Sequence, residues 1–415
     1  MSTAKSFIYY STIFMLFGSN LYWGSNTSLQ LFYLVLAVNL FLMLLMKRLW
    51  VPMGVLMLLG LLVFSAGIGI VRHTDTVLKS SKEVIGISGS AFYFSCFFRF
   101  IDFKLEKAFR SYAKMAYWIS IIGFIYFPFD YYFHQSMRLR SILSEPAMMA
   151  FTCLPALYYY ADQWQRSRKH GKELIVIFLA LLLAQSSTGF IGILFGVCLF
   201  CFRYRRIIVA IPIIVIGLGC GMYFLSDSFA VRFDDTINTF THSDVNGTNL
   251  STYVLFTNIY VMNRVLQEHP ILGNGIGSHG ESFYRYIGDL PLGNYEGNDL
   301  AYVNSEDASA MGTRLLSDMG FSGAVLLIWF VWRFRPEGDS EIDAMSKAIW
   351  IYFLIKIFRG GTYFEDEQYF FVCFYALHHV AIEWQKRTQR PAALPSSNQE
   401  VWTTPTNPLA ISKLA

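Results

Sequence analysis

The chain has 415 residues, of which 54% are hydrophobic and 15% are charged, with a formal net charge of +4. Soluble proteins carry about 25% charged residues. The charged residues here are clustered between long apolar runs. The composition therefore excludes an ordinary soluble domain and predicts a membrane protein without a nucleic-acid partner.

Long apolar segments recur along the chain. About 20 apolar residues cross the hydrocarbon core as a helix, so the pattern predicts an all-α polytopic membrane protein with about twelve spans. Several segments are short, which gives a range of ten to thirteen. The segments lie near 7–24, 28–46, 51–71, 84–101, 114–130, 146–161, 173–186, 187–202, 207–226, 313–332, 345–358 and 368–385.

Clusters of Lys and Arg set the expected orientation. Cytoplasmic loops are enriched in these residues, and here each cluster follows an even-numbered span when the N-terminus starts inside. The clusters lie at 47–48, 104–110, 166–172, 203–206, 333–335 and 386–390. Both termini are therefore expected in the cytoplasm. The first span lacks a cleavable signal-peptide pattern and is expected to remain as a helix.

The expected spans divide the chain into four regions. Residues 1–226 form an N-terminal transmembrane region of about nine helices, and residues 227–312 form one large external loop between helices 9 and 10. Residues 313–385 carry the C-terminal transmembrane helices. The tail, 386–415, is rich in Pro, Ser and Thr and is expected to be disordered and cytoplasmic.

The large loop contains two patterned stretches. "LSTYVLFTNIYVMNRVLQ" (250–267) has apolar residues at helical spacing and predicts an amphipathic helix. "HPILGNGIG" (269–277) resembles a phosphate loop, but it lies outside any βαβ unit, which excludes the dinucleotide and P-loop interpretations. Its glycines instead predict a tight turn with positive φ angles. Backbone N–H groups exposed there are candidates for meeting a lipid-linked phosphate.

Cysteines and acidic residues show no metal-binding pattern. The six cysteines all fall within expected spans, and C-L-F-C at 198–201 has no partner pair. The sequence therefore predicts neither a disulfide framework nor a zinc site. No clustered acidic site is evident, so we expect no metal and no cofactor.

Arginines lie on the external side, against the positive-inside trend. The planar fork of arginine grips a phosphate or carboxylate at two points, which the ammonium of lysine does not. The set therefore predicts an anionic ligand at the outer membrane surface, such as a pyrophosphate-linked lipid. The alternative is that each arginine pairs with a nearby acid. The set comprises Arg138, Arg140, Arg232, Arg264, Arg285 and Arg359, with Arg314 at the start of the tenth span.

Other polar groups have a structural and a functional interpretation. Glu145 precedes the proline that begins a span, so it is either a partner of the helix dipole or a carboxylate that accepts a sugar hydroxyl proton. "QSSTG" (185–189) breaks two helices, and its hydroxyls satisfy freed backbone groups or face the site. His279 follows the glycine turn and is either a solvated loop histidine or an acid, base or phosphate contact.

Four patterned segments occur in a fixed order along the chain. They are "RLRSILSEPAMMAF" (138–151), "LLLAQSSTGFIGIL" (181–194), "HPILGNGIGS" (269–278) and "VNSEDASAMGTRLLSDMGFSGAVLL" (303–327). In this order they resemble the bacterial Wzy-type polysaccharide polymerases over roughly residues 110–380. The same superfamily contains the O-antigen ligases. The chain departs from both patterns, because Arg264 lies much closer to the glycine turn than is common and Glu306 stands where many ligases have histidine.

The resemblance implies a GT-C-like membrane glycosyltransferase that acts at the periplasmic face of the bacterial inner membrane. The growing glycan passes from undecaprenyl pyrophosphate to the terminal sugar of an incoming lipid-linked repeat, without a metal. A Wzz-type chain-length regulator and other export-pathway proteins are implied partners. The expected catalytic bases are Glu145, His279 and Glu306, and the expected substrate contacts are Arg138, Arg232, Arg264, Arg314 and Arg359.

Two other functions remain open from the sequence. An O-antigen ligase performs the same chemistry with lipid A core as the acceptor. A transporter of lipid-linked sugars is the alternative from another class, although transporters often show paired repeats and buried charges at the midplane. The sugar, the linkage, the stereochemical course and the oligomeric state are not set by these patterns.

Overall fold

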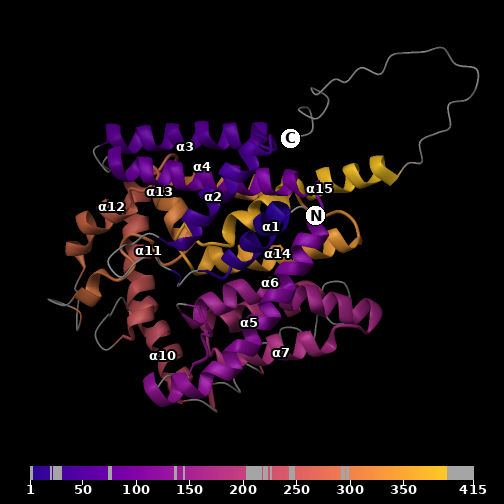
Figure 1. Cartoon of the computed structure of the whole chain (residues 1–415). Helices are drawn as coiled ribbons and strands as arrows, with labels where there is room; N and C mark the ends of the chain where they lie inside the picture. The colour runs from indigo at the N-terminus through magenta and orange to yellow at the C-terminus, as the bar shows by residue number, and fades with distance from the viewer. Residues whose placement is uncertain are drawn as a thin grey trace, which may run out of the picture.

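The chain folds into a bundle of helices in a computed structural model (Figure 1). No β-strand occurs in the part of the chain that the structure describes. That part comprises residues 3–18, 30–72, 77–134, 138–143, 145–201, 227–242, 248–290 and 299–389, with Leu21, Gly217, Tyr223, Phe224 and Tyr295. The predicted tail beyond residue 389 lies outside the described residues.

Of the fourteen longer helices that the structure describes, eleven overlap the apolar segments of the sequence and three lie within residues 227–312. They are α1 (Thr3–Met15), α2 (Leu31–Leu45), α3 (Met53–Val71), α4 (Val77–Phe100), α5 (Leu105–His134), α6 (Pro146–Ser167), α7 (Gly171–Leu183), α8 (Ser187–Cys201), α10 (Asp227–His242), α11 (Leu250–Glu268), α12 (His279–Tyr286), α13 (Met311–Arg333), α14 (Glu341–Phe358) and α15 (Gln368–Gln389). The expected all-helical class is confirmed.

Two described helices, α3 and α13, are by length and composition able to cross a membrane. Their most apolar windows have mean hydropathies of 2.5 and 1.6. The pair α4 and α5, bent by 113°, adds a third if it forms one broken span. Helices α1–α8 and α13–α15 overlap the segments expected to span, while most of 207–226 lies outside the described residues. The count of twelve stays a prediction.

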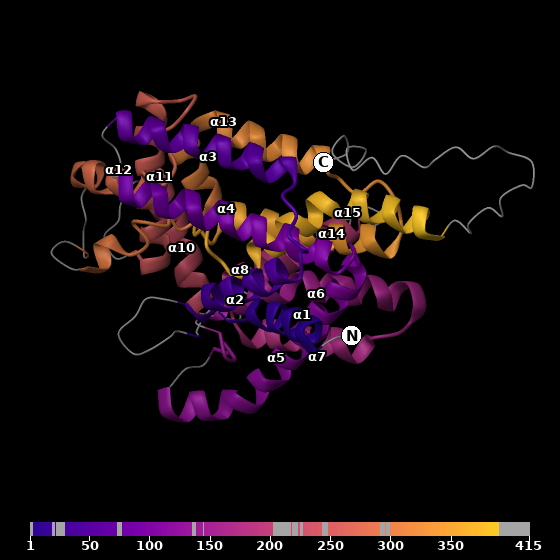
Figure 2. The same ribbon diagram turned by 45° about the horizontal axis from the view of Figure 1, so that its top comes forward.

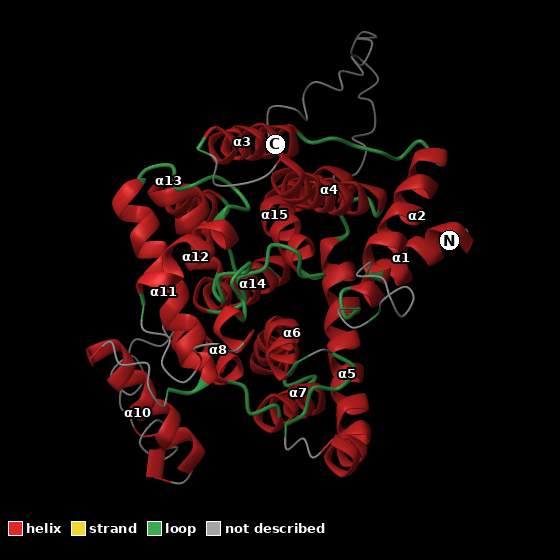
Figure 3. Ribbon diagram, turned by 90° about the vertical axis from the view of Figure 1, so that its left-hand side faces the viewer, coloured by secondary structure: helices red, strands yellow, loops and turns green. Residues whose placement is uncertain are grey.

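Helices α6 and α14 lie in the middle of the bundle, with α4 and α15 on one side and α7 on the other (Figure 3). They run antiparallel, because Tyr159 of α6 donates to Glu341 at 3.0 Å while Phe151 lies 5.3 Å from the Lys356 ammonium at the other end. Helix α8 packs on α6 through glycines such as Gly189, where an added Cβ would lie 3.5 Å from the Cβ of Ala150. Small residues allow such close helix packing.

Loops that were predicted to share one side of the membrane contact one another. On the expected cytoplasmic side the contacts are Arg110–Glu341, Arg166–Asp339 and Arg48–Asp102. On the expected external side they are Arg72–Gly273, Lys79–Glu306, Glu83–Arg314 and Arg138–Ala184. Two of the external contacts start from α4, and one of these reaches α13, whose label lies toward the left-hand end of Figure 1.

The large loop is helical over much of its described length. Its predicted amphipathic helix at 250–267 is confirmed as α11, and the side chain of Asn249 caps that helix by accepting from the Thr252 N–H at 3.1 Å. The inner face of α11 packs against α12 through Val261, Val265 and Phe283. This packing holds the start of α12, and with it His279, against the bundle.

The glycine turn after α11 forms backbone hydrogen bonds with α13 where that helix is interrupted. Gly320 has φ 60° and ψ −156°, which interrupts the hydrogen bonds of α13. Four backbone bonds to residues 270–275 replace those lost. They are Asn274 N–H to Ser317 O at 2.9 Å, Gly275 N–H to Asp318 O at 2.7 Å, Phe321 N–H to Pro270 O at 2.8 Å and Ser322 N–H to Ile271 O at 3.0 Å.

The predicted positive φ angles of this turn are confirmed. Gly273, Gly275 and Gly277 have φ of 57°, 101° and 84°. On its other side the turn touches α3, where the Ile276 N–H donates to the Ser65 hydroxyl at 3.0 Å. The turn therefore joins α3 to α13, and its glycines have a structural explanation.

Candidate functional site

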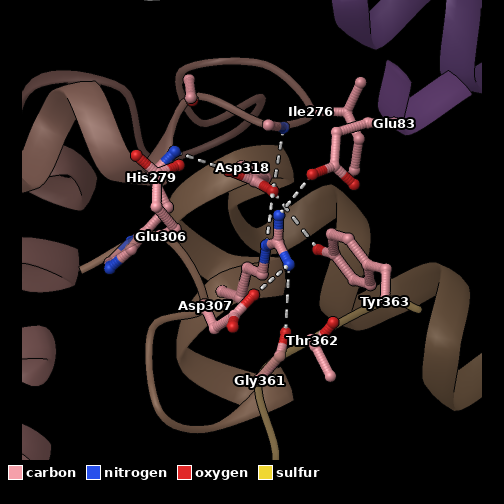
Figure 4. A network of polar contacts seen from close by, with 12 residues as sticks. Glu83, Ile276, His279, Glu306, Asp307, Asp318, Gly361, Thr362 and Tyr363 are labelled. Atoms are coloured by element: carbon pink, nitrogen blue, oxygen red, sulfur yellow. Dashed lines mark hydrogen bonds and ion pairs between the residues drawn. The ribbon is translucent and has the colours of Figure 1, made fainter. Parts of the chain in front are cut away.

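Arg314 is the centre of a buried charge network at the expected external end (Figure 4). Its side chain is 2% exposed. It donates to Glu83 at 2.8 Å and to Asp307 at 3.2 Å, and its Nε lies 3.7 Å from Asp318. The Tyr363 ring covers the guanidinium at 4.3 Å. Arg314 was expected to contact the substrate. In the structure, carboxylates of the same chain surround its guanidinium, so Arg314 stabilises the fold.

The Asp318 carboxylate accepts hydrogen bonds from backbone N–H groups at the glycine turn. One oxygen accepts from the Gly277 N–H and the other from the His279 N–H, both at 3.1 Å. The Tyr363 hydroxyl also donates to it at 3.4 Å. These N–H groups were the candidates for a lipid-linked phosphate. The structure corrects that expectation, because an anion supplied by α13 already fills the turn.

His279 is fully buried rather than solvated in a loop. Its Nε2 lies 2.8 Å from the Asn258 amide oxygen, while the Asn258 amide nitrogen donates to Val254 O. This geometry makes Nε2 the donor and leaves Nδ1 with a lone pair, which has no hydrogen-bond partner among the described residues. Burial, reinforced by Arg314 and Lys79, lowers the pKa of His279 to about 3. The ring is a neutral base that is closed off from solvent.

The burial of His279 predicts a stability that depends on pH. Its folded pKa of about 3 lies below the ordinary 6.5, so below pH 6.5 the unfolded chain takes up a proton that the folded chain refuses. The wild type is expected to lose about 1.4 kcal/mol per pH unit as the pH falls from 6.5 toward 3. A His279→Gln variant, which still donates to Asn258 but does not titrate, is expected to lose less.

Melting temperatures of both proteins in the same detergent, from pH 7.5 to 4.5, measure this difference. Carboxylates titrate in both proteins and cancel in the comparison. Equal slopes for the two proteins would show that His279 is not buried in its neutral form.

Glu306 lies beside His279 and is open to solvent. Its side chain is 55% exposed, and the Lys79 ammonium of α4 pairs with it at 2.6 Å. The carboxylate packs on the first turn of α12, where a Cβ added at Gly280 would lie 2.7 Å from it. A helix N-terminus favours an anion there. The structure thus brings His279, Glu306 and Arg314 together, with only Glu306 accessible.

Glu145, the third expected base, lies apart from this group. It is the N-cap residue of α6, with an extended backbone at φ −141° and no capping hydrogen bond from its side chain. Its side chain is exposed. A position before the first turn suits a carboxylate electrostatically, which agrees with the dipole interpretation and leaves the side chain accessible.

Two expected substrate contacts lie in the large loop. Arg264 of α11 pairs with Asp289 at 2.8 Å, and both side chains are well exposed. This is the pairing with a nearby acid that the sequence allowed as the alternative. Arg232 belongs to α10, but its side chain lies outside the described part of the structure.

Arg138 lies against the break between α7 and α8. Its Nε donates to Ala184 O at 3.4 Å, and the next residue, Leu139, donates its N–H to Leu183 O at 3.0 Å. Arg140, two residues on, grips Asp130 with both nitrogens, at 3.2 and 2.9 Å. The arginine segment and the start of "QSSTG" (185–189), which are distant in sequence, therefore lie close together at the expected external end.

Arg359 differs from the other expected contacts in its surroundings. It is the C-cap residue of α14, in an extended conformation, and its side chain is half-buried. Among the described residues its guanidinium has neither an ion pair nor a hydrogen bond. Burial lowers the pKa of Arg359, with no neighbouring carboxylate to oppose it. A partly desolvated cation without a counterion favours an anionic ligand.

A second buried charge network was not predicted from the sequence. Lys356 of α14 is 1% exposed and pairs with Glu365 at 2.7 Å. Asp366 and Glu367, which follow, are also buried, and burial with the charge of Glu365 raises the pKa of Asp366 to about 8. The available signal was a lysine inside an apolar span, which marks a polar interior. Lys79 and Glu83, near the entry of another span, carried the same signal.

Side chains suited to a metal ion do not gather in the described part of the chain. No group of three or more His, Cys, Asp or Glu there has a metal-binding arrangement. Glu365, Asp366 and Glu367 are consecutive, but Glu365 is taken by Lys356.

No protein-family model matches the chain, and no curated protein matches its sequence.

Proposed function

We propose that the protein is a membrane glycosyltransferase that polymerises lipid-linked oligosaccharide repeats. The donor is a glycan on undecaprenyl pyrophosphate, and the acceptor is a single lipid-linked repeat. The observation that carries the proposal is Arg359, a half-buried guanidinium that has no counterion among the described residues. The ordered resemblance to Wzy-type polymerases supplies the reaction.

The leaving group explains why an unpaired arginine matters. The acceptor hydroxyl attacks the anomeric carbon, the bond from that carbon to the pyrophosphate oxygen breaks, and negative charge accumulates on the departing pyrophosphate. A guanidinium that is already desolvated stabilises that charge more strongly than one in water. Arg359 therefore contacts the pyrophosphate, and Arg138 contributes from the break between α7 and α8.

Glu306 is the base in this proposal. It is exposed, whereas His279 is closed off. The next residue, Asp307, pairs with Arg314, which also donates to Gly361 O at 3.4 Å and so holds the segment after Arg359. The acceptor hydroxyl gives its proton to the Glu306 carboxylate as the new glycosidic bond forms. Lys79, whose ammonium lies 2.6 Å from the carboxylate, orients it.

Arg359→Ala is expected to abolish most polymerisation. In a strain that lacks the gene, wild type restores a ladder of glycan lengths on a gel, and Arg359→Ala leaves single repeats. The loss of one stabilising donor corresponds to a rate reduction of about 100-fold or more. Arg359→Lys keeps the charge without the fork and is expected to restore only short chains.

The control is Arg264→Ala, at protein levels matched by immunoblot. This variant removes the ion pair of Arg264 with Asp289, in which both side chains are exposed. It is expected to restore the full ladder of glycan lengths. A full ladder from Arg359→Ala refutes the assignment. Long chains that accumulate in the deletion strain without reaching lipid A identify a ligase, and lipid-linked repeats trapped in the inner leaflet identify a transporter.

A further inference from the structure

An apolar groove lies between α3 and α13. Its volume is about 480 Å³, and its walls include Phe64 and Ile68 of α3, Leu272 of the glycine turn, and Phe321 and Val325 of α13. The two serine hydroxyls along it are engaged, since Ser65 accepts from Ile276 N–H and Ser322 donates to Met319 O. The groove therefore presents almost only hydrocarbon.

The groove lies between the two described helices that are by length and composition able to cross a membrane. The views in Figures 1 and 2 both place α3 near α13, and the glycine turn joins them at one end. Phe64 and Val325 at its rim are 59% and 63% exposed. An empty apolar gap forfeits dispersion contacts, and hydrocarbon from the bilayer is the natural material to fill it.

A cation lies one helical turn beyond the α3 wall of the groove. Arg72 follows Ile68 by one helical turn and donates to Gly273 O, next to Leu272. No carboxylate is paired with Arg72 in the described parts of the chain. On the expected topology Arg72 is external, against the usual bias of basic residues. His269 is near it, and burial together with the Arg72 charge lowers the pKa of His269, so that ring adds no second charge at neutral pH.

We propose that this groove binds an anionic glycerophospholipid of the outer leaflet, with one acyl chain between α3 and α13 and the phosphate on Arg72. The volume falls within the range of about 300–1,000 Å³ that small-molecule sites occupy. Basic pockets between transmembrane helices bind anionic headgroups. The bound chain fills the gap beside the glycine turn and stabilises the joint between α3 and α13.

This lipid is separate from the carrier lipid of the proposed reaction. The chain of contacts from Arg72 to the segment after Arg359 runs through the glycine turn, where Arg72 bonds Gly273 O and Gly275 bonds Asp318 O, and then through Arg314. The carboxylates in that network repel a second pyrophosphate along the same path. The test of the lipid site therefore does not depend on whether the proposed function is correct.

Native mass spectrometry of the purified full chain tests the site. The protein is stripped of lipid in detergent and then offered phosphatidylglycerol and phosphatidylcholine with identical chains. Wild type is expected to retain phosphatidylglycerol about 5-fold more than phosphatidylcholine, the preference that one basic residue near a membrane surface supplies. Phosphatidylglycerol is also expected to raise the melting temperature.

Two variants separate the headgroup from the chain. Arg72→Gln, whose amide still donates to Gly273 O, is expected to lose the headgroup preference and keep some binding of both lipids. Val325→Trp fills the groove and is expected to lose both lipids and to melt without lipid as the wild type does, or higher. Arg333→Gln, at the other end of α13, is the matched control and should behave as wild type.

Three results overturn the proposal. The first is equal retention of the two lipids by wild type. The second is an unchanged preference in Arg72→Gln together with unchanged retention in Val325→Trp. The third is displacement of phosphatidylglycerol by undecaprenyl phosphate at equal concentration, which assigns the groove to the carrier lipid instead.

Discussion

Replacing Arg314 with methionine is expected to destabilise the protein more than replacing any other arginine of the expected site. Methionine keeps much of the side-chain volume but leaves Glu83, Asp307 and Asp318 without their shared cation. Removing one partner from a buried ion pair costs about 3–5 kcal/mol, because the remaining charge stays buried and uncompensated. The expected result is a large fall in melting temperature, measured by tryptophan fluorescence in detergent.

The matched control is Arg264→Met, which removes an exposed pair of the same type. Solvent screens exposed pairs strongly, so only a small change is expected. Adding Glu83→Gln to Arg314→Met should recover part of the loss, because it removes one of the uncompensated charges. The coupling between the two changes is then read from the double-mutant cycle. Equal effects of the two arginine replacements would contradict the burial of Arg314.

Gly275→Ala is expected to prevent the glycine turn from inserting between α3 and α13. The φ of 101° at Gly275 is strained for any residue with a Cβ, and an added Cβ would lie 2.5 Å from the Gly69 N atom. The obstructing atoms belong to the backbone of α3, so they cannot rotate away. Strained backbone alone costs about 1–3 kcal/mol, and the overlap adds to it. A lower melting temperature and a weakened glycan ladder are expected together.

Gly288→Ala serves as the control in the same loop system. A Cβ at Gly288 meets nothing within 4 Å, so stability is expected to change by less than about 0.5 kcal/mol. Since the turn positions Asp318 and His279, a stable Gly275→Ala protein with a normal ladder would show that the turn does not hold the site.

Local patterns predicted the helical class and two elements of the large loop correctly. The apolar periodicity of 250–267 predicted α11, and the spacing of glycines in 269–277 predicted positive φ angles. Both depend on interactions between residues a few positions apart, which a linear sequence displays directly. The number of spans depends on placement in a bilayer and remains a prediction.

The roles of individual charges did not follow from local patterns. Arg314 has Asp307 and Asp318 nearby in sequence, yet its shortest ion pair joins it to Glu83, 231 positions away. His279 was placed beside a glycine turn, but Asn258 of α11 and the packing of α12 decide that it is buried. Whether an arginine faces a ligand or a carboxylate depends on which helices come together.

The sequence by itself therefore determined the helical class, the α11 and turn conformations, and the set of arginines that are candidates for binding. Only the tertiary structure decided which of these residues stabilise the fold through ion pairs. Arg314, Arg264 and Arg140 are paired with carboxylates, while Arg359 and Arg72 are not paired with any in the described chain. The physical reason is that burial and counterions come from distant segments, and together they decide whether a charge stabilises the protein or remains available to bind.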